Sequence, residues 1–115
     1  MRCNYYVLQK RDLSYQNSCL IYAKEMQKAG NNGSASWFYI TAGEFDKAIQ
    51  SGEKAVEIGE KYALEHIAEA YYLKGDKENS KKYFKLFKQN AHDKLMTEKH
   101  FEVLKKLYPK KAEGL

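Results

Sequence analysis

The sequence has little proline, little cysteine and no long apolar run, and each shortage excludes a class of structure. Its one proline, Pro109, lies near the end of the chain, so no proline ring interrupts a helix before that position. The apolar stretches are only a few residues long, far short of the roughly 20 residues of a membrane-spanning helix, and no apolar signal segment follows Met1. We therefore expect a cytoplasmic protein without a membrane span.

The sequence also lacks the motifs of common catalytic sites. Cys3 and Cys19 are too far apart for a CxxC motif, so we expect free thiols, with an intramolecular disulfide as an alternative that only geometry can decide. No serine stands in a nucleophile-elbow pattern, and no glycine-rich phosphate loop is present. We expect neither enzyme activity nor a cofactor.

What the chain does have is enough apolar residues for one core and an uneven distribution of charge. Its 115 residues fit a single domain over residues 1–115, with 43% hydrophobic and 30% charged residues. The net charge is +5, but residues 44–69 carry −4 and residues 74–111 carry +7. Such asymmetry indicates either binding to an acidic partner or a lysine-rich face in water.

The chain repeats itself with a period of 32 residues. In each unit, an aromatic-rich segment precedes a short turn, and a second helical segment follows. The three copies of the turn are Arg11-Asp12-Leu13, Gly43-Glu44-Phe45 and Gly75-Asp76-Lys77. A period of this length is typical of stacked helical units that bury their apolar faces against one another.

Local signals predict an all-α fold. Apolar residues at positions 64, 67, 68 and 71 lie on one helical face, Gly75 suits a left-handed C-cap, and Asp76 can cap the next helix. Gly52 lies inside a predicted helix, where we expect it to allow close approach of a neighbouring helix. The seven predicted helices span residues 2–10, 13–29, 34–42, 45–59, 61–74, 77–91 and 95–108.

These residues resemble the tetratricopeptide repeat family, whose motif runs W-x2-L-G-x2-Y, then A-x3-F, then P. The third unit matches this motif in Leu64-x2-Ile67-Ala68-x2-Tyr71, and the second unit matches in Ser36-x2-Tyr39. The second unit departs from the motif at Gly52, where an aromatic residue is usual. All units lack the closing proline, and the period is 32 residues instead of about 34.

The resemblance implies a right-handed superhelix of about three antiparallel helix pairs, over residues 1–29, 30–60 and 61–92, with a C-terminal capping helix over residues 95–108. In the family, the first helix of each pair lines a concave groove that holds a peptide or a helix of another protein. The corresponding groove residues are Tyr5, Leu8, Trp37, Ile40, Thr41, Tyr62, Glu65, His66, Glu69 and Tyr72. For Tyr5 and Trp37, packing against a neighbouring helix or an added terminal segment is the alternative.

The side chains at these groove positions exclude some classes of ligand. Some family members hold a carboxylate terminus with a Lys/Asn/Arg clamp, but the corresponding residues are Trp37, Glu65 and Glu69, so we predict against that ligand. A Glu/His pair such as Glu65 and His66 can ligate a metal, but one pair is not a site. We therefore expect a packed or solvated His66 and no metal, and His100 has no partner in the sequence.

The lysine-rich C-terminal part suggests a second surface. Nucleic-acid binders combine such lysines with arginine and exposed aromatics, but this chain has only two arginines, both near its start. The basic face consists of Lys81, Lys82, Lys85, Lys88, Lys105 and Lys106.

The leading hypothesis is a scaffold or adaptor domain that binds a protein segment in its groove. The alternatives are a nucleic-acid-associated accessory domain that uses the basic face, and a self-associating piece of a longer helical solenoid. Nucleic acid is the less favoured partner because arginine is scarce.

Overall fold

The computed structural model describes Cys3, residues 9–10, 13–90 and 94–115, and in these residues the protein is all-helical. Most of the first predicted helix, residues 2–10, lies outside this part, as do Tyr5 and Leu8. A short 3-10 turn, Leu13–Tyr15, precedes the α-helices. These are α1 (Gln16–Lys28), α2 (Asn32–Thr41), α3 (Phe45–Glu57), α4 (Ala63–Lys74), α5 (Lys77–Asn90) and α6 (Lys94–Leu107).

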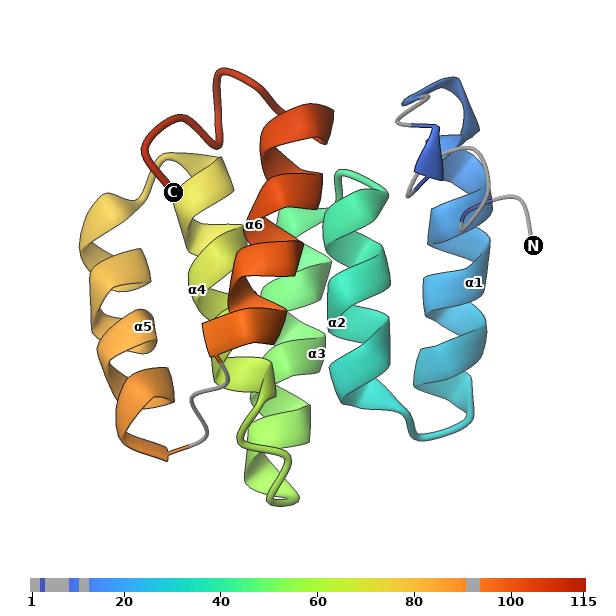
Figure 1. The fold of residues 1–115 in the computed structure, drawn as a ribbon. Coiled ribbons are helices and arrows are strands. Elements are labelled where there is room, and N and C mark those ends of the chain that lie inside the picture. Colours follow the sequence, from blue (N-terminus) through green and yellow to red (C-terminus); the bar gives the residue numbers. More distant parts are fainter. Residues whose placement is uncertain (1–2, 4–8, 11–12, 91–93) are drawn as a thin grey trace.

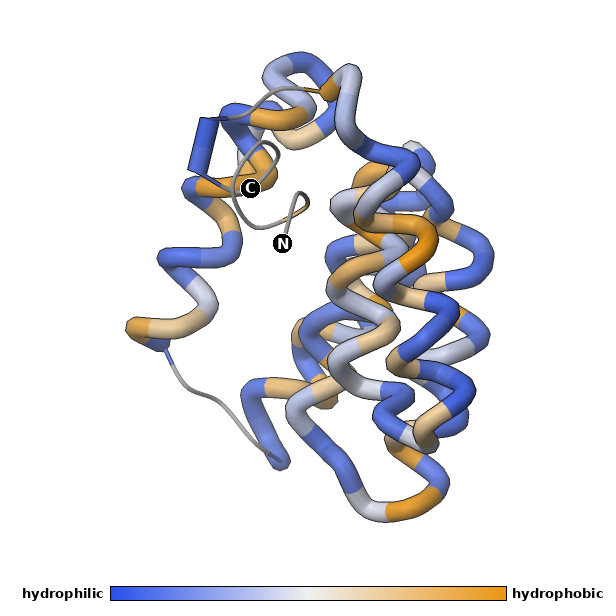
Figure 2. The backbone as a smooth tube through the Cα atoms, turned by 90° about the vertical axis from the view of Figure 1, so that its right-hand side faces the viewer, coloured by the Kyte–Doolittle hydropathy of each residue, from blue (hydrophilic) through white to orange (hydrophobic). Residues whose placement is uncertain are grey.

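The helices form a stack with one helix laid across it. Figure 1 shows α1 to α5 in chain order across the view, with successive helices running in opposite directions, and α6 in front of the stack between α2 and α4. Figure 2, turned by 90°, shows α6 as a separate layer on one side of the stack. Each described helix is too short or too polar to cross a membrane.

The helix ends follow from residues that recur with the period. Gly43 and Gly75 adopt φ angles of 81° and 95°, which a residue with a Cβ seldom adopts. Their amides donate to the carbonyl oxygens of Ile40 and Tyr72, both at 3.0 Å, and so close α2 and α4. Asp76 accepts a hydrogen bond from the amide of Asn79 at 3.1 Å, which confirms it as the cap of α5.

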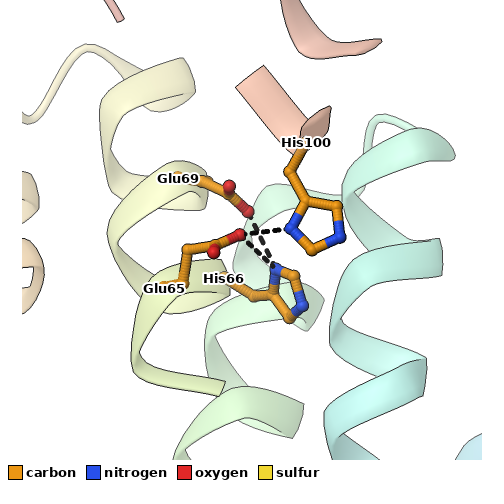
Figure 3. Close-up of side chains that lie close together, drawn as sticks. All are labelled: Glu65, His66, Glu69 and His100. Atoms are coloured by element: carbon orange, nitrogen blue, oxygen red, sulfur yellow. Dashed lines mark hydrogen bonds and ion pairs between the residues drawn. The ribbon is translucent and has the colours of Figure 1, made fainter. Parts of the chain in front are cut away.

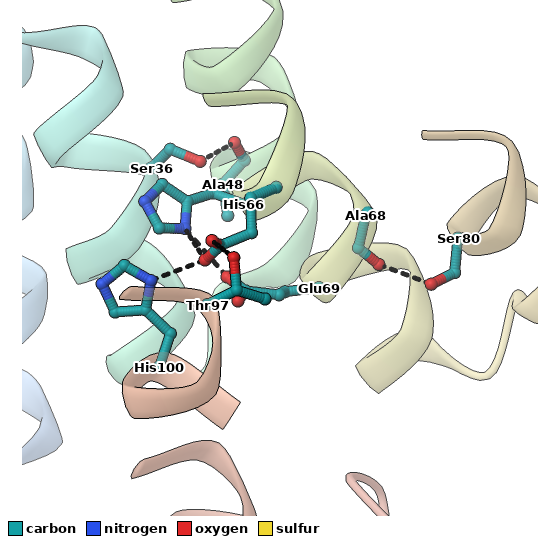
Figure 4. A network of polar contacts seen from close by, with 9 residues as sticks. Ser36, Ala48, His66, Ala68, Glu69, Ser80, Thr97 and His100 are labelled. Carbon is teal, nitrogen blue, oxygen red and sulfur yellow. Dashed lines mark hydrogen bonds and ion pairs between the residues drawn. The ribbon is translucent and has the colours of Figure 1, made fainter. Parts of the chain in front are cut away.

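Two serine hydrogen bonds show that the 32-residue period is a repeat of packing. Ser36 in α2 donates to the carbonyl oxygen of Ala48 in α3 at 2.7 Å, and Ser80 in α5 donates to that of Ala68 in α4 at 2.8 Å (Figure 4). Ser36 and Ala68 are related by the period, and so are Ala48 and Ser80. Each pair of helices is therefore joined at the same two positions, with the donor and acceptor exchanged.

Gly52 allows the close approach between neighbouring helices that the sequence predicts. It lies within α3, and a Cβ atom there would be 2.5 Å from Cγ1 of Ile67 in α4 and 3.2 Å from Oγ of Ser36. Ile67 is only 1% exposed, so its side chain fills the space that the glycine leaves.

The expectation of free thiols is wrong, because Cys3 and Cys19 form a disulfide with a Cα–Cα distance of 4.8 Å. Both residues are fully buried, and Cys19 lies near the start of α1. Sequence spacing could not show this pairing, which depends on where Cys3 lies against α1. Since disulfides persist in oxidising compartments, the bond gives no support to the predicted cytoplasmic location.

We expect Gly52→Ala to lower the free energy of unfolding by about 1 kcal/mol or more. The new methyl group would overlap Ile67, and overpacking of this kind costs roughly 1–3 kcal/mol, which outweighs the helix propensity gained, about 1 kcal/mol. Urea unfolding would measure the change. Gln50→Ala, at an exposed position of the same helix, is the matched control and should change stability by less than about 0.5 kcal/mol. Equal stability of Gly52→Ala and wild type would contradict the packing described here.

Cys19→Ser should destabilise the protein by about 3 kcal/mol, because the disulfide closes a loop with a sequence separation of 16 residues. Urea unfolding with and without reductant measures the loss, and the variant should no longer respond to reductant. Iodoacetamide applied to the unfolded, unreduced wild type should label neither cysteine. Labelling of both would show that the bond does not form.

Candidate functional site

The C-terminal helix covers the face that the repeat resemblance assigns to a groove. The hydroxyl of Tyr108, just after α6, donates to the carbonyl oxygen of Ile40 in α2 at 2.6 Å and accepts from Nε2 of Gln16 in α1 at 2.9 Å. Leu104 and Leu107 of α6 are at most 2% exposed and belong to the same core cluster as Ile40. The segment predicted to cap the end of the stack therefore lies across its α2–α4 face.

The position of α6 determines how exposed the predicted groove residues are. Ile40, Thr41, Glu65, His66 and Glu69 are all buried. Trp37 and Tyr72 are half-buried, and Tyr62 is 44% exposed. The face is therefore closed by the chain itself instead of forming an open groove, and partner binding by these residues stays a prediction.

Trp37 is half-buried and packs against neighbouring helices. Its ring lies 4.6 Å from that of His100 in α6 and 5.4 Å from that of His66 in α4, measured between ring centroids. The tryptophan thus fills the space between α2, α4 and α6, as the alternative interpretation of this residue expects.

Four titratable side chains meet beside Trp37, three from α4 and one from α6 (Figure 3). Nδ1 of His100 lies 2.6 Å from Oε2 of Glu65, and Nδ1 of His66 lies 2.8 Å from Oε1 of Glu69. Nδ1 of His66 is also 3.6 Å from Oε2 of Glu65. We call Glu65, His66, Glu69 and His100 the polar cluster.

Burial and mutual contact shift the pKa values within the polar cluster in different directions. Burial raises the pKa of Glu65, but the hydrogen bonds from His100 and Glu69 and the charges of the two histidines outweigh this and lower it to about 2. Burial lowers the pKa of His66 to about 4. Burial and the neighbouring Glu65 raise the pKa of Glu69 well above its usual value. Near neutral pH the cluster alone therefore holds an ionised Glu65 beside a neutral His66, and burial favours the protonated form of Glu69.

Sequence reasoning found the three members on α4 as groove candidates but missed their association with α6. His100 is separated from Glu65 by 35 positions, and Thr97, whose Oγ1 donates to Oε1 of Glu65 at 2.7 Å, by 32 positions. The signal in the sequence is weak: Thr97 and His100 lie one turn apart on one face of a predicted helix. Nothing local indicates that this face meets α4.

A cavity of about 580 Å³ lies between α5, α6 and the C-terminal residues. Its apolar walls include Phe84 and Phe87 of α5 and Phe101 of α6, and the rings of Phe84 and Phe101 meet edge to face with centroids 5.5 Å apart. Four exposed lysines of α5 also line it: Lys77, Lys81, Lys85 and Lys88. The cavity therefore combines an aromatic interior with a positive rim, which we call the lysine rim.

The basic face predicted from the sequence is only partly one surface. Its members Lys81, Lys85 and Lys88 lie on the lysine rim, and no ion pair with a described residue engages them. Lys82 is not part of the cavity lining, and its Nζ is 5.8 Å from the centroid of the Tyr83 ring. Lys105 and Lys106 project from the exposed side of α6, where Lys106 contacts Glu102 at 3.4 Å.

Comparison of the chain with family models, with curated proteins and with solved structures finds no match. The resemblance to the tetratricopeptide repeat family therefore stays a prediction.

Tyr108→Phe should lower the free energy of unfolding by about 1–3 kcal/mol, since it removes two hydrogen bonds beneath α6, one to the carbonyl of Ile40 and one from the side-chain amide of Gln16. Tyr72→Phe removes a hydroxyl of the same kind that bonds to the carbonyl of Glu113 at an exposed position, and its cost should stay below about 0.5 kcal/mol. Thermal and urea unfolding compare the two. Equal losses would mean that Tyr108 does not hold α6 on the stack.

Proposed function

We propose that this protein is a tetratricopeptide-like interaction module that binds an acidic, amphipathic protein segment in the cavity between α5 and α6. The observation that carries the proposal is an aromatic cavity bordered by lysines that have no acidic partner within the described chain. Support for a right-handed superhelix comes from the antiparallel helix pairs and from the serine bonds that recur with the 32-residue period.

The size and lining of the cavity suit apolar side chains of a protein partner. A volume of about 580 Å³ lies within the range of roughly 300–1,000 Å³ that is common for ligand sites. The half-buried rings of Phe84 and Phe101 offer apolar contact area with few rotatable bonds, and the buried Phe87 completes the apolar lining, which favours recognition of aliphatic or aromatic side chains.

Charge favours an acidic partner. Lys81, Lys85 and Lys88 follow one another at helical spacing along α5, so their ammonium groups border the same side of the cavity. A helix with glutamates beside its apolar stripe would place carboxylates opposite them, which increases the rate of association and selects against basic segments.

A single-stranded nucleic acid is the weaker alternative for the same surface. Bases stack on exposed aromatic rings, but Phe87 is only 2% exposed and Phe84 and Phe101 are half-buried. The two arginines of the sequence lie outside the described residues. Lysine contacts to phosphate would therefore carry most of any binding, and such binding falls steeply with salt.

The test is a fluorescence titration with a defined amphipathic helical peptide longer than about 15 residues, with leucine and phenylalanine on one face and glutamate on the other. We expect it to bind at least about tenfold more tightly than the same peptide with lysine in place of glutamate. The double variant Lys81→Glu/Lys85→Glu should lose at least about tenfold in affinity for the acidic peptide.

The matched control is Lys105→Glu/Lys106→Glu, which makes the same change in net charge at two exposed residues of α6 outside the cavity lining and should retain affinity. Equal losses in the two double variants would show only a general attraction to positive charge. A single-stranded oligonucleotide serves as the second probe. Tighter binding of the oligonucleotide, with an affinity that falls log-linearly with salt, would replace the protein-binding proposal.

A further inference from the structure

We propose that Glu65, His66, Glu69 and His100 form a buried binding site for a zinc-like divalent transition-metal ion, with two imidazole nitrogens and two carboxylate oxygens as ligands. The ion would join α4, which supplies three ligands, to α6, which supplies His100. This site is separate from the cavity of the proposed function, so the two proposals can fail independently.

The four ligand atoms are close enough to share one ion. One atom from each side chain can be chosen so that all four lie within 4.8 Å of one another, and the closest pairs are 2.6 Å and 2.8 Å apart. Zinc bonds of about 2.0–2.1 Å in a tetrahedron require ligand atoms about 3.3 Å apart. The observed separations lie on both sides of that value, so small side-chain rotations would complete the geometry.

A second observation points to a missing ligand. Oε2 of Glu69 is buried without a hydrogen-bond partner among the described residues, and the whole side chain is 0% exposed. A buried carboxylate oxygen without a partner costs free energy, so native structures seldom retain one. A cation within the polar cluster would balance the negative charge of this carboxylate and of the Glu65 carboxylate.

The donor set selects the class of ion. Imidazole nitrogen suits zinc and its neighbours in the first transition row, whereas calcium and magnesium prefer ligand sets made of oxygen alone. With four protein ligands, all of them buried except the half-buried His100, the site resembles a closed structural site more than a catalytic one with an open position.

Contacts around the ligands support their orientation. Thr97 donates to Oε1 of Glu65, which leaves Oε2 facing the histidines. The Trp37 ring lies against both imidazoles and limits their rotation. Contacts between neighbouring residues and the ligating side chains orient these ligands and exclude water from the ion.

The experiment uses untagged full-length protein freed of metal by a chelator. Titration with Zn²⁺ should show one tight site per chain by calorimetry and should raise the melting temperature, while Mg²⁺ and Ca²⁺ at the same concentrations should do neither. Co²⁺ should give the intense visible absorption of a tetrahedral centre. Absence of both a stoichiometric Zn²⁺ site and a Zn²⁺-dependent rise in melting temperature would overturn the proposal, leaving the polar cluster as a hydrogen-bond network.

Two pairs of variants locate the ion. Glu69→Gln and His100→Gln should each reduce the affinity for Zn²⁺ by at least about tenfold. Their matched controls are Glu98→Gln, at an exposed carboxylate of α6, and His92→Gln, at the remaining histidine, and both should bind Zn²⁺ like the wild type. Loss of binding in His92→Gln but not in His100→Gln would place the ion elsewhere and reject the site.

Folding is separated from metal binding by circular dichroism of each variant with chelator present. Glu69→Gln keeps the shape of the side chain and should retain the helical signal, so that its failure to respond to Zn²⁺ reports on the ligand itself. Should one of the two ligand variants fail to fold, the other variant and the wild-type titration still decide the outcome.

Discussion

The contact between α6 and Glu65 is the interaction on which the rest of the structure depends. Glu65 is a buried carboxylate in the first turn of α4, and a buried charge requires close partners. Thr97 and His100 supply them at 2.7 Å and 2.6 Å, and both belong to α6. Because these partners come from one distant helix, they fix where α6 lies. The closed α2–α4 face, the packing of Trp37 against His66 and His100 and the cavity beside α5 all follow from that position.

Beneath α6, the stack is held by small residues that let helices approach closely. The serine–carbonyl bonds of Ser36 and Ser80 join the two helices of each pair, and the bare backbone of Gly52 receives the side chain of Ile67 from the following helix. Close contact of this kind leaves little room for adjustment, because protein interiors are packed as densely as organic crystals. The repeat thereby presents a well-defined surface on which α6 can pack.

The two candidate sites share α6. His100 contacts Glu65 in α4, whereas its neighbour Phe101 meets Phe84 in α5 and lines the cavity. The acidic and basic segments of the chain contribute to different sites. Two of the acidic residues of the −4 segment, Glu65 and Glu69, are directed inward to the polar cluster, while the +7 segment supplies the lysine rim. An ion bound by the polar cluster would hold the helix that forms one wall of the cavity.

The sequence alone determined the helical class, most helix ends and the 32-residue period, because these depend on local preferences: apolar spacing, the left-handed conformation of Gly43 and Gly75, and the cap at Asp76. Only the tertiary structure decided the Cys3–Cys19 bond, the cover over the predicted groove and the meeting of His100 with Glu65. Each of these joins residues from separate elements. Amphipathicity shows that α6 has a face to bury, but the surface that receives it depends on how all the other helices pack.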